Sequence, residues 1–274
     1  MDTTIRSLPV YSEKTVTQYT REGIASIDLN VLGEEPLSIR VQGKPYAVVM
    51  RTPGDEIPHV VGFCLGEGII DGYDDIKQIA FCDGTDTNVV TITLQAARRL
   101  EVGPILERRG FISQTSCGIC GKEVVSDLIQ SVQPLRDQTL VSWRDLLGCL
   151  DNFSARQSLY RTTRTSHAAV AFDAAFQPQT SAEDVGRHNA VDKAIGKLLI
   201  DGAISRTICM ILSSRISYEL VQKVARARIP IILAMSRPTQ LAVDLAEKLN
   251  ITLACSPDEE TLLVYTGNQR LKKE

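Results

Sequence analysis

Hydrophobic and polar positions alternate along much of the first hundred residues, as they do in β-strands. Before this pattern begins, residues 1–20 are polar and have no clear period, which predicts a loose or edge-forming tail. Alternation starts near residue 24, and Gly33 and Gly43 mark turns within it. The elements expected here are strands within residues 24–49, a short helix at 58–66, and strands at 77–81 and 88–94. They predict a small α+β domain at residues 1–110.

From residue 143 onward, amphipathic helices alternate with short apolar strands. Helices are expected at residues 143–153, 188–199, 218–226 and 238–249. Strands are expected at residues 168–172, 207–213, 230–235, 252–255 and 262–265, with a further extended piece before Asp184. This pattern predicts a layered α/β domain at residues 143–274, joined to the first domain by a cysteine-containing loop and a connecting helix at 111–142. The predicted fold class is α/β, or α+β for the whole chain.

Composition and charge argue against several classes of protein. With 274 residues, 43% of them hydrophobic, the chain can form one large domain or two ordinary ones. Its net charge of -3 supplies no basic field for a nucleic-acid backbone, so no nucleic-acid partner is expected. The N-terminus lacks the apolar core of a signal peptide, and the longest apolar run, residues 229–235, is interrupted by Pro230 and too short to span a bilayer. We expect a cytoplasmic protein without a membrane partner, whose seven cysteines are mostly reduced thiols.

The sharpest local signal is a pair of cysteines, Cys117 and Cys120, in a stretch rich in Gly, Ser and Thr that predicts an exposed loop. Two thiols at this spacing suit a shared metal ion, a redox disulfide, or a nucleophile beside a helper. A zinc site usually needs a second such pair, and a thioredoxin-type pair needs a different order of elements. A nucleophilic or sulfur-carrying thiolate fits better, because Lys122 and the arginines at 108–109 favour the charged form. The other cysteines are isolated, and three in apolar segments are expected to be inert core residues: Cys64, Cys209 and Cys255.

Polar and basic residues also gather where three predicted helices begin. A helix start that carries an arginine is a natural anion site, and in open α/β sheets ligands bind beyond the carboxyl ends of the strands. The candidate anion-binding residues are Gly186, Arg187, His188 and Asn189 at the first helix start, Ser214, Arg215 and Ser217 at the second, and Ser236 and Arg237 at the third. The alternative is ordinary helix capping, with Asp184 as an N-cap and Asp192 and Lys193 on a solvated face. We favour a pocket for a phosphate or another anion.

Taken together, these segments resemble a known family. Its motifs in this sequence are SCGICG at residues 116–121, SHAAVAFD at 166–173, EDVGRHNAVDKAIGKLL at 183–199, SSRISYELVQK at 213–223 and VYTGNQR at 264–270. The combination of CGxCG with EDVGRHNAVDK is similar to that of the FdhD family, the sulfur-carrier accessory proteins of formate dehydrogenase. The resemblance runs from about residue 24 to the C-terminus.

The resemblance implies a fold and a task. The fold is a small N-terminal domain followed by a C-terminal domain of cytidine-deaminase-like topology. The task is that of a sulfurtransferase, which takes sulfur as a persulfide from a cysteine desulfurase. It passes that sulfur to the molybdenum or tungsten cofactor of formate dehydrogenase, a bis-molybdopterin guanine dinucleotide. The family's persulfide cysteine corresponds to Cys117, with Cys120 as its partner, and a homodimer is the expected state for a chain of this size.

One loop departs from the family pattern. In the family, the loop ahead of the position of Tyr265 contains Gly and Arg and helps to bind the guanine dinucleotide. The corresponding residues here are Ser256, Pro257, Asp258, Glu259, Glu260 and Thr261. Three consecutive acids repel a diphosphate, so these positions are cofactor candidates by alignment alone.

Three other functions are alternatives. A non-catalytic cofactor-binding chaperone would use the loop of Cys117 and Cys120 only structurally or to hold a metal ion. A redox switch would form a reversible disulfide between the same two cysteines. A zinc deaminase needs a His-x-Glu and a Pro-Cys-x-x-Cys helix start, whereas the chain has residues 186–189 and 214–217 at those places. Those ligands are missing, so no resident metal ion is expected.

Overall fold

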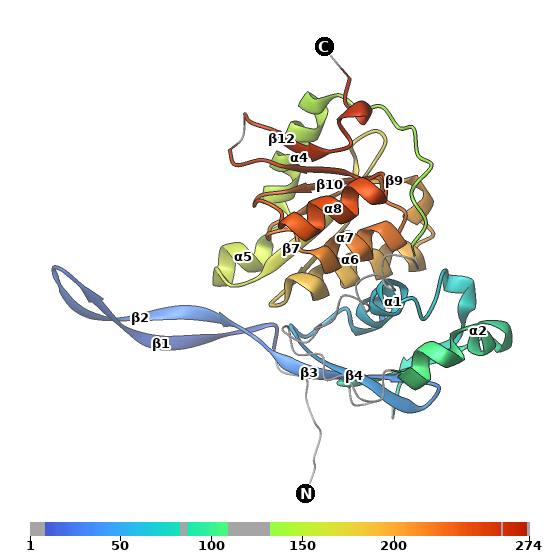
Figure 1. Cartoon of the computed structure of the whole chain (residues 1–274). Coiled ribbons are helices and arrows are strands. Elements are labelled where there is room, and N and C mark those ends of the chain that lie inside the picture. Colours follow the sequence, from blue (N-terminus) through green and yellow to red (C-terminus); the bar gives the residue numbers. More distant parts are fainter. Residues whose placement is uncertain (1–8, 83–86, 109–131, 259, 273–274) are drawn as a thin grey trace, which may run out of the picture.

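The N-terminal residues form a long hairpin that extends away from the rest of the molecule (Figure 1). The computed structural model describes residues 9–82, 87–108, 132–258 and 260–272. Within them, β1 (Tyr11–Thr20) pairs along its full length with β2 (Gly23–Leu32) in antiparallel register. The expected edge-forming segment is therefore confirmed at β1, and it is not a loose tail. Both faces of the hairpin are exposed to solvent, so hydrophobic and polar residues do not alternate along β1.

A four-stranded sheet follows, in the order β4-β3-β6-β5. Its strands are β3 (Glu35–Val41), β4 (Lys44–Arg51), β5 (Ile76–Phe81) and β6 (Val89–Leu94). Helix α1 (Glu56–Gly66) follows β4, and helix α2 (Ala96–Arg108) follows β6. One face of the sheet carries fully buried side chains from β3 and β6: Leu37, Ile39, Val90 and Ile92. The alternation in the sequence thus corresponds to a sheet with one buried face.

The larger sheet has six strands in the order β12-β11-β10-β9-β7-β8. Its strands are β7 (His167–Asp173), β8 (Pro178–Asp184), β9 (Thr207–Leu212), β10 (Ile231–Ala234), β11 (Thr252–Cys255) and β12 (Leu263–Thr266). β9, β10 and β11 are mutually parallel. β8 is antiparallel to β7, which is antiparallel to β9, so β8 runs in the same direction as β9. The carboxyl ends of β8, β9, β10 and β11 therefore lie along one edge of the sheet.

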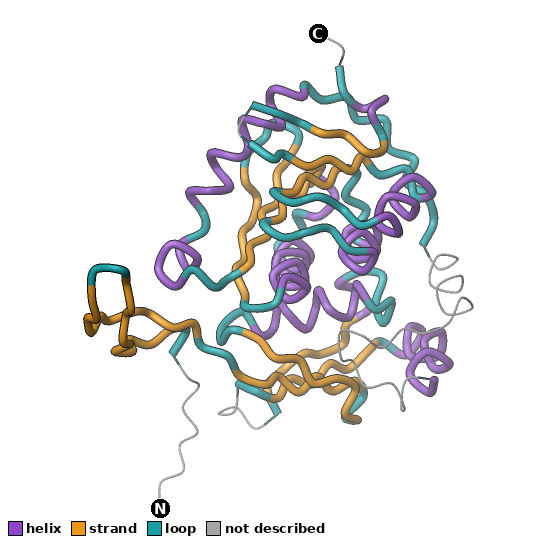
Figure 2. The backbone as a smooth tube through the Cα atoms, turned by 60° about the vertical axis from the view of Figure 1, so that its left-hand side comes forward, coloured by secondary structure: helices purple, strands orange, loops and turns teal. Residues whose placement is uncertain are grey.

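Helices cover both faces of the larger sheet (Figure 1, Figure 2). On one face lie α6 (Arg187–Ile200), α7 (Tyr218–Arg226) and α8 (Gln240–Lys248). On the other face lies α4 (Trp143–Ala155), followed by the short helix α5 (Ser158–Thr163). One buried apolar cluster runs from the four-stranded sheet through α1, α6, α7 and α8 to the larger sheet, and a second lies beneath α4.

Helices α1 and α6 cross with their backbones almost in contact. A Cβ atom on Gly62 would overlap the carbonyl oxygen of Asp192, and one on Gly196 would overlap the carbonyl oxygen of Pro58. Only glycine permits such an approach. Since α1 lies in the chain between β4 and β5 of the smaller sheet, and α6 follows β8 of the larger one, this crossing fixes the two sheets against each other.

The mixed α and β architecture predicted from the sequence is confirmed. The pattern misses α2, which contains the poor helix formers Gly103 and Pro104, and it misses the short α5. The division of the chain at residues 110 and 142, and the cytidine-deaminase-like topology, stay predictions. No helix among the described residues is long and apolar enough to cross a membrane.

Candidate functional site

The loops that carry the candidate anion-binding residues meet at one edge of the larger sheet. They follow the carboxyl ends of β8, β9, β10 and β11, which the strand directions bring to the same side. Hydrogen bonds join neighbouring segments: the N–H of Thr239 donates to the carbonyl of Ile216 in the preceding loop at 3.0 Å, and the N–H of Ser256 donates to the carbonyl of Ala234 at the end of β10 at 2.9 Å. We call this region the loop edge, defined by residues 185–189, 213–217, 235–239, 256–258 and 260–261. The three separately predicted helix starts are therefore parts of one surface.

Gly186 forms a tightly packed turn before α6. Its N–H donates to Asp184 Oδ1 at 2.8 Å, and Asn189 Nδ2 donates to the same oxygen at 2.8 Å. A Cβ atom on Gly186 would lie 2.7 Å from Asn189 Nδ2, so any larger residue here would displace the Asn189 side chain from its hydrogen bonds. The N-cap of α6 is Gly186 and not Asp184, which corrects the capping alternative. Because glycine has no side chain, it provides no side-chain cap for the first N–H groups of α6.

Arg187 and His188 are the first two residues of α6, and both are partly exposed. His188 Nε2 lies 2.7 Å from Glu219 Oε2, and the Ser217 hydroxyl lies 3.5 Å from the same nitrogen. The hydrogen bond from His188 holds the pKa of Glu219 below its ordinary value. Since Ser217 and Glu219 share one ring nitrogen, they do not form a nucleophile–base–acid relay through His188. The contacts instead tie the start of α6 to the start of α7.

His167, at the start of β7, belongs to the same edge. Its Nδ1 lies 3.5 Å from the hydroxyl of Ser213, which accepts the N–H of Ala168 at 2.9 Å. Burial and the nearby Arg187 guanidinium lower the pKa of His167, which favours the neutral ring. The sequence pattern alone predicts no role for His167 or Glu219. The signal that could have found them is their position in the quoted motifs, at a strand end and a helix start that share this edge.

The loops after β9 and β10 each combine a buried or partly buried serine with an exposed arginine. Ser214 is buried, and its hydroxyl donates to the carbonyl of Arg215 at 3.1 Å. Ser236 is partly buried. The side chains of Arg215 and Arg237 are exposed. The hydroxyl of Ser214 therefore shapes its own loop, while the arginines are accessible to an anion from solvent.

The loop after β11 is acidic and closed on itself. The buried hydroxyl of Ser256 contacts the carbonyl oxygens of Asp258 and Thr261. Asp258 accepts the N–H of Glu260 at 3.0 Å, and a hydrogen bond from the side chain of Thr261 lowers the pKa of Asp258. Pro257 is exposed, as are Asp258 and Glu260. Glu259 lies outside the described residues.

Two buried ion pairs support α6 behind the loop edge. Lys193 Nζ lies 2.7 Å from Asp184 Oδ2, and Lys223 of α7 pairs with Asp192. All four side chains are buried. The alternative that Asp192 and Lys193 lie on a solvated face is therefore wrong, because α6 is enclosed between α1 and the larger sheet. Burial raises the pKa of Asp192, and the Lys223 ammonium opposes that rise.

Cys117 and Cys120 lie outside the described residues. Of the described cysteines, Cys82 is exposed and the others are buried: Cys64, Cys149, Cys209 and Cys255. The expected burial of the three cysteines in apolar segments is confirmed. Burial raises the pKa of Cys149 to about 12 and also raises the pKa values of Cys64 and Cys209. Among the described residues, no group of three or more His, Cys, Asp or Glu side chains is placed to hold a metal ion.

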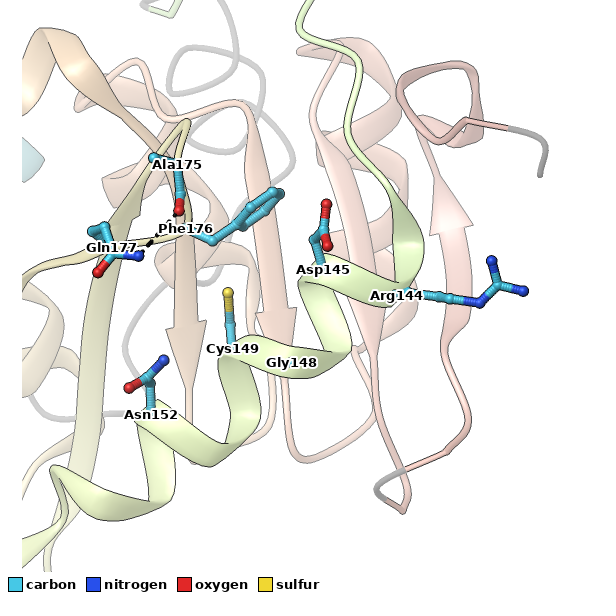
Figure 3. Close-up of a pocket in the computed structure, with 8 residues that line it drawn as sticks. All are labelled: Arg144, Asp145, Gly148, Cys149, Asn152, Ala175, Phe176 and Gln177. Atoms are coloured by element: carbon cyan, nitrogen blue, oxygen red, sulfur yellow. Dashed lines mark hydrogen bonds between the residues drawn. The ribbon is translucent and has the colours of Figure 1, made fainter.

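A hollow of about 450 Å³ lies away from the loop edge (Figure 3). It is lined by residues of α4 and of the turn between β7 and β8: Arg144, Asp145, Gly148, Cys149, Asn152, Ala175, Phe176 and Gln177. This turn lies at the opposite edge of the larger sheet, because β7 ends where β8 begins. The hollow and the loop edge are therefore separate features.

Two relatives of similar sequence carry the same name. The sulfur carrier protein FdhD of Streptomyces avermitilis is 37% identical over 268 residues, which is 92% of each chain. The protein of the same name from Nocardia farcinica is 36% identical, covering 96% of this chain and 95% of its own.

The fold has a counterpart among solved structures. A protein from Desulfotalea psychrophila, described as a formate dehydrogenase accessory protein, superposes with a TM-score of 0.77 at 22% identity, covering 96% of this chain and all of that one. This likeness supports the fold alone. The model of the FdhD/NarQ family matches residues 32–272. The chain with these motifs and this loop edge is a member of the FdhD/NarQ family.

Proposed function

We propose that this protein is a sulfur carrier in the maturation of formate dehydrogenase, with Cys117 as the residue that holds the sulfur. The observation that carries the proposal is the meeting of four loops at one edge, in a chain whose family match spans residues 32–272. The names of its relatives agree with this role. Cys64, Cys149 and Cys209 are poor candidates, because burial raises the pKa values of their thiols, and the thiolate is the nucleophile. Cys255 is buried as well.

The proposed sulfur uptake needs no external oxidant or reductant. The Cys117 thiolate attacks the terminal sulfur of a persulfide on a cysteine desulfurase. A new S–S bond forms at Cys117 as the S–S bond of the donor breaks, and the donor cysteine leaves as a thiolate. Cys120 stabilises the resulting persulfide or assists its release.

The loop edge is the proposed binding surface for the acceptor, the bis-molybdopterin guanine dinucleotide of formate dehydrogenase. This acceptor is cargo, and its metal takes the sulfur. Its diphosphates fit the N-terminal end of α6, whose N-cap is a glycine, and the side chains of Arg187, Arg215 and Arg237. The buried hydroxyls of Ser214 and Ser256 contact their own loops, so they shape the surface.

The acidic loop does not fit a diphosphate. Asp258 and Glu260 are exposed and negatively charged, and like charges repel. Their carboxylates accept hydrogen bonds only, which matches the N–H groups of a guanine base. We therefore assign this loop to the base, at a distance from the phosphates.

Mass spectrometry tests sulfur uptake directly. The native intact mass is measured before and after incubation with a cysteine desulfurase and cysteine. We expect the gain of one sulfur atom in the unsubstituted chain and its loss in Cys117→Ala. Cys82→Ala is the matched control, because Cys82 is the exposed cysteine of the described residues and should not alter the gain.

The same variants separate the carrier from the chaperone. In cells that depend on this protein, Cys117→Ala should abolish formate dehydrogenase activity although the protein folds. Full activity with Cys117→Ala, or a resident zinc ion without sulfur uptake, would favour the cofactor-binding chaperone. We further propose a homodimer, for which light scattering at several protein concentrations is the test.

A further inference from the structure

Thr52 links the smaller sheet to the loop edge through all of its polar groups. It directly follows β4, is 1% exposed, and lies 132 positions before Asp184 in the chain. Its N–H donates to Asp184 Oδ2 at 3.1 Å, and its carbonyl accepts Lys193 Nζ at 2.8 Å. Its hydroxyl oxygen accepts the N–H of Val185 at 3.0 Å. One threonine therefore contacts the last residue of β8, the first residue of the turn that follows, and a lysine of α6.

These contacts belong to a network that sets the shape of this turn. The two carboxylate oxygens of Asp184 have different partners. Oδ1 accepts hydrogen bonds from the Gly186 N–H and from Asn189 Nδ2. Oδ2 accepts one from the Thr52 N–H and forms the ion pair with Lys193. Asn189 also donates to the carbonyl of Met50 at 2.7 Å, so the end of β4 is held at a second point. The buried side of the turn is thus occupied by protein contacts. Its other side carries the partly exposed Arg187 and His188.

The hydroxyl of Thr52 has a specific role in this network. Val185 is the first residue after β8. Its N–H lies outside the pairing of β8 with β7 and donates a hydrogen bond to Thr52 Oγ1. Without that acceptor the N–H loses its partner, and a half-buried turn must rearrange to find water or another acceptor. A rearranged turn would move the helix start that presents Arg187. Binding is weakened when a site must be ordered again on each encounter.

We propose that Thr52 is a positioning residue, which holds the turn at residues 185–188 ready for the phosphates of a guanine nucleotide. The inference rests on the proposed function of the loop edge. It adds that affinity at this edge depends on a residue that directly follows β4 of the smaller sheet and does not touch the ligand.

Calorimetric titration with guanosine diphosphate as the probe tests this role on the full chain. Thr52→Val keeps the size and shape of the side chain but removes the acceptor for Val185. We expect it to weaken binding by about tenfold, whereas Thr52→Ser restores the hydroxyl and binds like the unsubstituted chain. Lys197→Met is the matched control, because it breaks the Lys197–Asp55 pair, at 2.7 Å another link between α6 and the segment before α1.

The outcomes separate this inference from the proposed function. If the unsubstituted chain does not bind the probe, or Arg187→Ala leaves its affinity unchanged, the binding surface itself is wrong. If Arg187→Ala weakens binding but Thr52→Val does not, only the role of Thr52 is wrong. Equal losses in Thr52→Val and Lys197→Met would also overturn it, because they would indicate a general effect of loosening the two sheets.

A measurement on the unsubstituted chain covers the case in which Thr52→Val fails to fold. Guanosine diphosphate should slow hydrogen exchange at the amide of Val185, because ligand and threonine hold the same turn. Unchanged exchange at Val185 under saturating nucleotide would overturn the proposal.

Discussion

Lys223 Nζ lies 2.7 Å from Asp192 Oδ1, and both side chains are enclosed where α1, α6 and α7 meet. The same ammonium lies 5.4 Å from the centre of the Phe63 ring on α1. A buried pair is costly to desolvate, but removing one partner is costlier, because the other charge stays buried alone. The pair therefore matters for the packing behind the loop edge.

Lys223→Met should destabilise the protein by about 3 kcal/mol. Urea unfolding followed by circular dichroism measures this loss. The double variant Asp192→Asn with Lys223→Met should recover part of it, because no unpaired charge remains. Lys248→Met, at an exposed lysine near the end of α8, should change the free energy of unfolding by less than about 0.5 kcal/mol. Equal changes in the free energy of unfolding for Lys223→Met and Lys248→Met would show that the buried pair does not contribute more to stability than an exposed lysine does.

The crossing of α1 and α6 makes a second prediction, about two glycines in helices. Gly62→Ala places a methyl group against the carbonyl of Asp192, and overpacking against backbone should cost about 3 kcal/mol. Gly148→Ala in α4 is the opposite case, because no other atom lies within 4 Å of the new methyl group. That change should stabilise the protein by about 0.5–1 kcal/mol. Thermal unfolding of both variants checks the pair, and a harmless Gly62→Ala would contradict the close crossing.

The position of the loop edge could be predicted from the sequence, because the rule it uses is local. A buried strand followed by a polar helix start places that start at the carboxyl end of the strand, and this held for the starts of α6, α7 and α8. The strand order was not needed to name Arg187 or Arg215. It was needed to learn that the two belong to one surface.

The network of Thr52 could not be predicted in this way. The residue lies in the segment Arg51-Thr52-Pro53-Gly54, which reads as a turn, and its partner Asp184 is 132 positions away. Spacing also failed within one helix: Leu241, Leu245 and Leu249 have the period of one apolar face, but Leu241 is 43% exposed. It lies in the first turn of α8, beside the open loop edge. Whether such a residue is buried, and what it contacts, depends on the tertiary structure and not on the local spacing.

His59 predicts a dependence of stability on pH. It is fully buried in α1, and burial together with the ammonium groups of Lys193 and Lys223 lowers its pKa well below 6.5. As the pH falls below about 6.5, the unfolded chain takes up a proton at His59 and the folded chain does not. The free energy of unfolding therefore falls, by at most about 1.4 kcal/mol per pH unit from this group.

Replacing His59 by Gln removes this titration. Urea unfolding at several pH values between 5.5 and 7.5 should give a smaller pH slope for His59→Gln than for the unsubstituted chain. His167 shares the lowered pKa and stays in both proteins, so the difference in slope belongs to His59. Identical slopes would mean that the ring is solvated or already charged in the fold.

The cysteines give the last prediction, which concerns the reactivity of the folded chain. Four of the five described cysteines are buried, and Cys82 alone of these is exposed. A thiol must be accessible and ionised to react, and burial raises the pKa of Cys149 to about 12. In the double variant Cys117→Ala with Cys120→Ala, a coloured disulfide reagent should therefore titrate one thiol quickly. The remaining four should react only after unfolding in guanidinium chloride.

Adding Cys82→Ala should remove the fast phase, and a fast phase that persists would place a second accessible thiol among residues that the fold buries. Because these variants report accessibility without any donor, they also establish which thiols can compete with Cys117 for sulfur.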